Sequence, residues 1–249
     1  KEKDPVIIDY LTAENKYTDS FMGKHQPLVD VLYNEMLGRI KQTDLSVPTR
    51  IGDYWYFNKT EEGKQYPTYL RSKTRDGANA ETLLDQNEMA KGFKYFAIGS
   101  FEISDDGNML AFSTDTTGYR QYTLQFKDLR TGNILPDKVE RVTSTEWSPD
   151  GKYFFYGQED DVSKRSDKIF CHVVGTTGAD TLLFEEKDVL FNCGIGRSRD
   201  KKMMFIQSGA ATMSEYRYLA ADNPLGEWKI ISPRRENHEY SADFDMGEF

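Results

Sequence analysis

Two hydrophobic stripes at helical spacing open the chain. Asp4 and Pro5 read as an N-cap followed by a first-turn proline, and Gly23 marks the end of a first predicted helix. A second helix is predicted to begin at Pro27. The stripes comprise Ile7, Leu11, Tyr17 and Phe21 in the first helix and Leu28, Val31, Leu32, Met36 and Ile40 in the second. We therefore expect a two-helix segment over residues 1–45.

From about residue 50 the periodicity changes. Helical spacing gives way to short aromatic and β-branched runs, which are separated by Gly, Asp, Asn and Pro. These runs are Tyr54–Phe57, Tyr66–Leu70, Met109–Ser113, Tyr122–Phe126, Tyr153–Tyr156, Ile169–Val174 and Lys202–Ile206. No helical pattern alternates with them, so this part of the chain is predicted to be all-β.

The β region also repeats itself. Phe101–Phe112 aligns with Thr145–Tyr156, and each copy contains a Ser-x-Asp-Gly turn followed by an aromatic strand. A weaker copy is Gly196–Phe205, and a degenerate one is Arg50–Phe57. A period of about 40–50 residues with four strands is typical of a β-propeller blade. The alternative is a single β-sandwich whose hairpins are similar by chance.

The repeat count predicts an incomplete ring. Residues 46–249 hold about four blade-like units of four antiparallel strands, and Tyr240–Phe249 resembles the first strand of another blade. Both ends of the chain look cut. We therefore expect a partial, open β-propeller preceded by the two-helix segment, truncated from a larger ring.

Composition excludes several classes of function. The chain has 41 acidic and 32 basic residues, a net charge of −9 and no run of more than two basic residues, which argues against nucleic-acid binding. Its apolar runs are far shorter than the roughly 20 residues that span a bilayer, so no membrane association is expected. Cys171 and Cys193 do not make a disulfide scaffold, and we expect both to be reduced and buried.

A catalytic constellation is not evident. Gly196–Asp200 lacks the second glycine of a nucleophile elbow and lies on a predicted blade turn. His25, His172 and His238 show no acid–base or metal-ligand spacing. Cys171, His172 and Cys193 are ligand types, but a structural role is expected for the cysteines. No catalytic residue, metal site or cofactor is predicted within this chain.

Specific segments resemble the oligopeptidase B branch of the prolyl oligopeptidase family. They span most of the chain: Thr60–Pro67, Leu84–Glu88, Ser104–Gly107, Asp115–Leu124, Lys127–Gly132, Val142–Ser144, Glu185–Asp188 and Ala221–Trp228. The resemblance implies a serine peptidase in which a seven-bladed propeller caps an α/β-hydrolase domain and gates access to it. It implies cleavage of short peptides after Arg or Lys. The Ser, Asp and His of the triad would lie in the C-terminal hydrolase domain, which this chain lacks.

The resemblance sets further expectations. The helical segment would pack on the hydrolase domain, so in this chain its stripe should be exposed, mobile or buried in a second copy. Arg120 and Glu140 are the candidate residues of the inter-domain rim. The expected partners are the hydrolase domain and short basic peptides, and the expected compartment is the cytoplasm, with the periplasm as an alternative.

Two other functions stay open at this stage. The chain could be a stand-alone propeller that serves as a protein-interaction module, which predicts a closed ring. It could instead be a propeller enzyme with its own site at the central channel. That reading needs converging His or carboxylate groups, and the sequence shows no such set.

Overall fold

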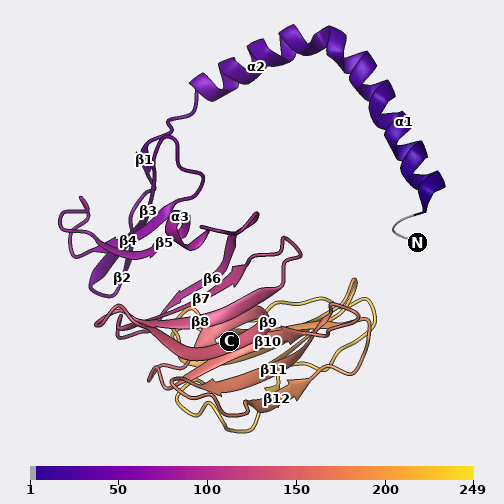
Figure 1. Ribbon diagram of the computed structural model, residues 1–249. Helices are drawn as coiled ribbons and strands as arrows, with labels where there is room; N and C mark the ends of the chain where they lie inside the picture. Colours follow the sequence, from indigo (N-terminus) through magenta and orange to yellow (C-terminus); the bar gives the residue numbers. More distant parts are fainter. Residues whose placement is uncertain (1–3) are drawn as a thin grey trace.

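The computed structural model describes residues 4–249, and β-strands dominate that part of the chain. Two helices lead into a succession of antiparallel sheets (Figure 1). Almost every strand pairs with its neighbour in the sequence, as in consecutive hairpins. This up-and-down order is that of propeller blades, and it confirms the prediction of a mainly-β, propeller-type fold.

The two predicted helices form with little change in their limits. Helix α1 (Pro5–Met22) begins at Asp4, whose side chain accepts a hydrogen bond from the amide of Val6 at 3.0 Å. A 3-10 turn (Gly23–His25) joins α1 to α2 (Gln26–Gly38), so the chain bends at Gly23 instead of leaving helical geometry. The two helices form an arch that projects away from the sheets (Figure 1).

The apolar stripe of this arch is open to solvent. Ile7 and Leu11 are each 50% exposed and Leu28 is 57% exposed. Between residues 5 and 38 no helical side chain is buried. Exposure is one of the outcomes expected for this stripe, and the structure confirms it.

The first sheet forms blade 1. Gly52 and Asp53 make the tight turn between its second and third strands, with Ile51 opposite Tyr54. This hairpin is the degenerate copy of the repeat. The strands are β1 (Asp44–Leu45), β2 (Thr49–Ile51), β3 (Tyr54–Thr60), β4 (Thr68–Ser72) and β5 (Glu81–Asp85), followed by the short helix α3 (Gln86–Met89).

The second sheet has seven strands and contains two blades. The strands are β6 (Ala97–Ile103), β7 (Met109–Asp115), β8 (Tyr122–Asp128), β9 (Ile134–Trp147), β10 (Tyr153–Glu159), β11 (Ser166–Val173) and β12 (Thr181–Glu185). Blade 2 consists of β6, β7, β8 and the first part of β9. Blade 3 consists of the last part of β9 together with β10, β11 and β12.

Strand β9 joins the two blades without interruption. Its first part pairs with β8, and its last part pairs with β10. Val142 has a partner on each side, Tyr122 and Gln158. The backbone at Arg141 has a φ of +60°, and the pairing changes partner at this point. None of the runs predicted from the sequence lies within this strand, because polar residues interrupt its apolar pattern.

The third sheet is blade 4. It contains β13 (Asn192–Arg197), β14 (Met203–Gly209), β15 (Ser214–Ala220) and β16 (Lys229–Ile230). Tyr240–Phe249 forms no strand, which corrects the expectation of a further blade strand. The Tyr240 hydroxyl accepts a hydrogen bond from the Tyr216 amide at 2.9 Å, and Phe244 is buried against blade 4. The tail is therefore held by side-chain packing on blade 4 rather than by a ladder of its own.

A serine side chain closes each repeated turn. In the first copy Ser104 Oγ donates to Asp106 at 2.6 Å and accepts from the amide of Met109 at 2.9 Å. Ser148 and Ser198 make the same two bonds in blades 3 and 4. The turn residue has positive φ in all three copies and is Gly107, Gly151 or Lys201. This shared geometry is the physical basis of the sequence repeat.

Hydrophobic clusters lie between successive blades. Phe154 and Tyr156 of β10 belong to the cluster shared with blade 2, whereas Phe155 faces the cluster shared with blade 4. Both faces of the blade are therefore covered. A strand buried on both faces can be apolar at every position, which explains the unbroken aromatic run of β10.

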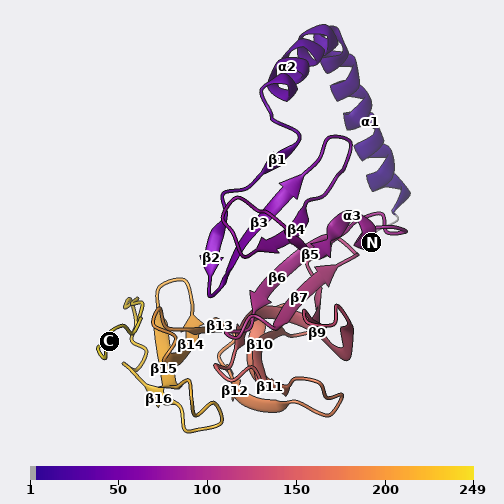
Figure 2. The same ribbon diagram turned by 90° about the vertical axis from the view of Figure 1, so that its left-hand side faces the viewer.

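The arc of blades is open. Within residues 4–249 no strand of the first sheet pairs with β13–β16, and the blades follow one another around a concave side (Figure 2). The structure thus confirms a partial, open propeller of four-stranded antiparallel blades. The stand-alone interaction module predicts a closed ring, which the described residues do not form.

Candidate functional site

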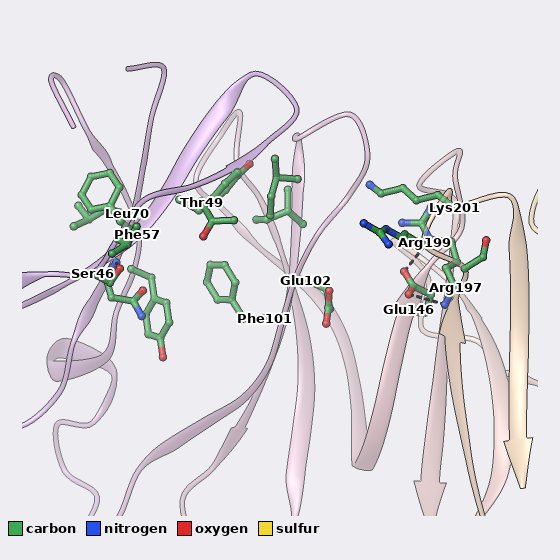
Figure 3. A pocket seen from close by; sticks show the side chains of 17 residues that line it. Ser46, Thr49, Phe57, Leu70, Phe101, Glu102, Glu146, Arg197, Arg199 and Lys201 are labelled. Carbon is green, nitrogen blue, oxygen red and sulfur yellow. Dashed lines mark hydrogen bonds and ion pairs between the residues drawn. The ribbon is translucent and has the colours of Figure 1, made fainter. Parts of the chain in front are cut away.

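A cavity of about 560 Å³ opens on the concave side of the arc. All four blades contribute to it, so we call it the inner pocket (Figure 3). Its size falls in the usual range for ligand sites. It is lined by Ser46, Val47, Thr49, Ile51, Tyr56, Phe57, Asn58, Tyr69, Leu70, Phe101, Glu102, Ile103, Glu146, Arg197, Ser198, Arg199 and Lys201.

One wall of the inner pocket is largely apolar and aromatic. The rings of Tyr69 and Phe101 stack with centroids 5.0 Å apart, across the contact between blades 1 and 2. Ile51 and Leu70 line the same side. Flat rings of this kind attract the aliphatic stem of a long side chain and the face of a cation.

The opposite wall is an ionic network centred on Arg197 at the end of β13. Its guanidinium forms two bonds to Asp105, at 2.7 and 2.9 Å, and one to Glu146 at 3.0 Å. Lys201 Nζ binds Asp105 at 2.7 Å. Burial works to raise the pKa of Asp105, but the hydrogen bonds from Arg197 and Lys201 outweigh it and lower that pKa. These groups connect blades 2, 3 and 4 on the pocket side.

Glu102 lies between the two walls, at the end of β6 (Figure 3). Burial raises the pKa of its carboxyl to about 7; repulsion from Glu146 adds to this rise and Arg197 opposes it. Its backbone carbonyl accepts a hydrogen bond from the Trp147 indole at 3.0 Å, which fixes the strand. The side chain thus carries a carboxyl group that titrates near neutral pH inside a cavity.

This convergence is not evident in the sequence. Glu102, Glu146 and Arg197 are far apart in the chain, and only the repetition of blades brings their strands together. One signal was present: Glu102 and Glu146 occupy equivalent positions, two residues before the turn serine of their repeats. Equivalent positions in successive blades face the same central space.

The predicted rim residues lie outside the inner pocket. Arg120 is exposed and has a φ of +60°, and its amide donates to Asp115 at 2.8 Å. Glu140 is exposed on β9, opposite Thr123 of β8. Both therefore lie at the same end of the β8–β9 pair. Their contact with another domain stays a prediction.

A buried polar cluster around His172 is a second feature that the sequence does not reveal. The two ring nitrogens of His172 lie 3.0 Å from Asp137 and 2.8 Å from Asp180. The Tyr156 hydroxyl donates to Asp180 at 2.7 Å, and the His172 ring stacks on Phe126. The cluster ties β9, β10 and β11 to the loop before β12. We refer to it as the His172 cluster.

The other candidate residues have structural surroundings. Ser198 is committed to its turn through Asp200 and Met203. Cys171 and Cys193 are free and buried, as predicted, and burial raises the pKa of each thiol to about 12. Among residues 4–249 no three His, Cys, Asp or Glu side chains are arranged to hold a metal ion. No helix in this range is long and apolar enough to span a membrane.

Comparison with known proteins decides the family. Residues 1–249 match the family model described as the prolyl oligopeptidase N-terminal β-propeller domain. The chain belongs to this family. Family membership confirms the resemblance found in the sequence, and it accounts for the arc of blades that the fold displays.

Individual relatives are considerably longer than this chain. It is 39% identical to dipeptidyl aminopeptidase BI of Pseudoxanthomonas mexicana, covering 98% of this chain and 36% of that protein. It is 31% identical to protease 2 of Moraxella lacunata, covering 95% and 36%. The fold superposes on oligopeptidase B of Leishmania major with a TM-score of 0.87 at 27% identity, covering 97% and 35%. The chain thus spans about a third of the length of these relatives.

Proposed function

We propose that this chain is the propeller portion of an oligopeptidase B-like serine endopeptidase that cleaves short peptides after Arg or Lys. The observation that carries the proposal is the similarity to oligopeptidase B over nearly the whole chain, at a TM-score of 0.87. In this proposal the catalytic Ser, Asp and His lie in a C-terminal α/β-hydrolase domain of the same polypeptide. The propeller portion alone is not catalytic.

The proposed reaction is acyl transfer in that hydrolase domain. A serine hydroxyl attacks the peptide carbonyl while histidine accepts its proton, and aspartate orients the histidine. The propeller contributes access control. A folded protein cannot pass the ring of blades, whereas a short flexible peptide can, and opening between the two domains would limit the rate of entry. The net charge of −9 favours the approach of basic peptides.

A second candidate activity is release of dipeptides from an amino terminus. It is favoured by the 39% identity to a protein named dipeptidyl aminopeptidase BI, which exceeds the 31% identity to protease 2. Both candidates use the same acyl-transfer chemistry. They differ in where along the peptide the bond is cut.

Product analysis with the full-length protein tests both candidates. The substrates are matched octapeptides with Arg, Lys or norleucine at an internal position, each with a free or an acetylated amino terminus. Internal cleavage after Arg and Lys, with none after norleucine and no effect of acetylation, supports the endopeptidase. Removal of dipeptides only from free amino termini supports the second candidate. If no peptide bond is cut, both are wrong.

The propeller portion provides the matched control. Residues 1–249 alone should hydrolyse none of these peptides under the same conditions. Hydrolysis by this portion would contradict the assignment of the catalytic groups to another domain.

A further inference from the structure

Glu102 has no ion-pair partner, although Arg197, Arg199 and Lys201 line the same pocket. Neither a salt bridge nor a side-chain hydrogen bond is formed by its carboxyl within residues 4–249. Arg197, whose charge lowers the pKa of Glu102, already uses its Nε, Nη1 and Nη2 groups on Glu146 and Asp105. Lys201 is bound to Asp105. The pocket therefore holds a carboxylate without an ion-pair partner, while Arg197 and Lys201 are bound to other carboxylates.

An ionised carboxylate that is partly removed from water and lies near another carboxylate is unfavourable for the fold. Burial and repulsion from Glu146 both disfavour the ionised form of Glu102. A cation that enters from solvent would relieve both effects. Such a group finds a carboxylate in the pocket without having to break an existing ion pair.

The shape of the inner pocket fits a cation carried on an aliphatic stem. Glu102 follows Phe101 on β6, so the two side chains leave the strand on opposite faces, Phe101 toward Tyr69 of blade 1 and Glu102 toward Glu146 and Arg197, and both line the pocket (Figure 3). Lysine and arginine side chains have this amphipathic form, with an apolar stem and a charged head. An aromatic wall next to a carboxylate offers contacts to both parts.

We propose that the inner pocket binds a lysine or arginine side chain of a short peptide, with Glu102 as the carboxylate that receives the cationic head. The identification of that peptide as a substrate rests on the proposed function, whereas the pocket chemistry does not. Binding would hold a basic peptide on the concave side of the propeller. The raised pKa of Glu102 agrees with this role and makes binding weaken as the pH falls below about 7.

Arg199 is the competing feature of the pocket. It lines the same cavity, and its side chain forms no ion pair within residues 4–249, although its amide donates to Asp243 at 3.0 Å. An anionic ligand would use Arg199 in place of Glu102. The experiment therefore includes an anion of matched length.

The test measures binding of n-butylguanidinium to the full-length protein by isothermal titration calorimetry at pH 8. This probe carries the arginine head and stem but no peptide bond. Neutral N-butylurea and anionic pentanoate are the matched probes. The protein is first treated with a serine-directed sulfonyl fluoride, which blocks the catalytic serine of the proposed function.

The Glu102→Gln variant removes the charge and keeps the shape of the side chain. We expect at least a tenfold weaker affinity of this variant for n-butylguanidinium, with no change in Glu62→Gln, which alters an exposed glutamate outside the pocket. Wild-type affinity should fall about thirtyfold between pH 8 and pH 5.5, following the ionised fraction of a carboxyl with a pKa of about 7. This pH series tests the proposal even if the variant does not fold.

Three results would overturn the proposal: equal affinity of wild type and Glu102→Gln, equal binding of N-butylurea, or binding of pentanoate in place of the guanidinium. Failure of the proposed function is seen separately, as absence of peptide hydrolysis. If the protein hydrolyses no peptide but still binds the guanidinium in a Glu102-dependent way, the pocket proposal stands and only the proposed peptidase function is wrong.

Discussion

At the scale of single residues, the turn serines are the most regular feature of the molecule. Ser148 is buried, and its hydroxyl both donates to Asp150 at 2.7 Å and accepts from the Tyr153 amide at 2.9 Å. The hydroxyl thus replaces backbone partners that the turn cannot supply. The same arrangement at Ser104 and Ser198 shows that the repeat is maintained by hydrogen bonding as well as by turn shape.

Ser148→Ala should destabilise the fold by about 1–2 kcal/mol, because the half-buried Tyr153 amide loses its partner. Urea unfolding monitored by tyrosine and tryptophan fluorescence measures the change. Ser241→Ala is the matched control, since Ser241 is exposed, and it should stay within about 0.5 kcal/mol of wild type. A Ser148→Ala variant as stable as the control would show that the serine hydroxyl does not stabilise the repeated turn.

Glu102 should make stability depend on pH in an unusual direction. Its pKa in the folded chain, about 7, lies above the ordinary value of 4.5, so the folded state holds the proton more tightly than the unfolded state does. Stability from this group is therefore complete below about pH 4.5 and declines as the pH rises to about 7. Above that range the ionised group is a net cost to the fold.

The Glu102→Gln variant isolates this contribution. At pH 8 it should unfold at higher urea than wild type, by roughly 1 kcal/mol after allowance for solvent screening, and at pH 4.5 the two should coincide. Glu62→Gln should follow wild type at both pH values. A Glu102→Gln protein that is less stable at pH 8 would mean that the carboxylate has a cationic partner.

At the scale of elements, the links between blades come from buried polar groups as well as from apolar clusters. The His172 cluster connects β9, β10 and β11, and the Arg197 network connects blades 2, 3 and 4. Each ring nitrogen of His172 faces a carboxylate oxygen, and Phe126 covers the ring. Blade 3 is thereby fixed to its neighbours at two separate places.

His172→Phe tests the first of these links. The new ring can still stack on Phe126, but Asp137 and Asp180 lose their shared partner in a buried site. We expect a loss of about 1–3 kcal/mol in the free energy of unfolding, as is usual when buried acceptors lose their hydrogen-bond partner. The exposed His25→Phe should change stability by less than about 0.5 kcal/mol. Comparable values for the two variants would show that the cluster is not a structural link.

Arg197→Lys tests the second link. Lysine keeps the charge but cannot bind Asp105 with two parallel bonds while also reaching Glu146. A loss of about 1–3 kcal/mol is expected in urea unfolding. Arg39→Lys, in an exposed pair with Glu35 on α2, should have little effect. If Arg197→Lys changed the free energy of unfolding no more than Arg39→Lys does, the Arg197 network would not contribute to the stability of the fold.

The sequence was sufficient for elements whose signal is local. The hairpin of Gly52 and Asp53 and the Ser-x-Asp turns are coded within a few residues, and they form as predicted. Strand β9 and the His172 cluster were missed because they depend on contacts between residues far apart. Asp137 lies 35 positions before His172, and no spacing rule connects them. The prediction of a strand over Tyr240–Phe249 was wrong because a strand-like composition is not sufficient to form one. This segment packs on blade 4 through its side chains.

At the scale of the whole molecule, the exposed helical arch and the open arc both leave surface without a cover inside residues 4–249. Stripe residues such as Tyr17, 70% exposed, resemble core residues in type. The proposed hydrolase domain would cover this stripe. Limited proteolysis of residues 1–249 should therefore cut between residues 5 and 40 before it cuts the blade loops, and mass spectrometry of the fragments measures the order. Slower cutting of the helices than of the loops would contradict this view.

Arg120 and Glu140 are the candidate residues of the rim between the two proposed domains. Arg120→Ala in the full-length protein should change kcat/KM several-fold if Arg120 holds the two domains together, while unfolding stays within about 0.5 kcal/mol of wild type. Glu140→Gln should act in the same direction. Arg130→Ala, which removes another exposed arginine of blade 2, is the control. An activity profile identical to that of the control would remove Arg120 from the rim.

The continuity of β9 has a mechanical consequence. A single strand carries main-chain hydrogen bonds into both blade 2 and blade 3, so these blades cannot separate without breaking a ladder. The contacts between blades 1 and 2 and between blades 3 and 4 have no such ladder within residues 4–249. We therefore expect relative motion of the blades only at these two contacts. Blades 2 and 3 should move together as one rigid unit.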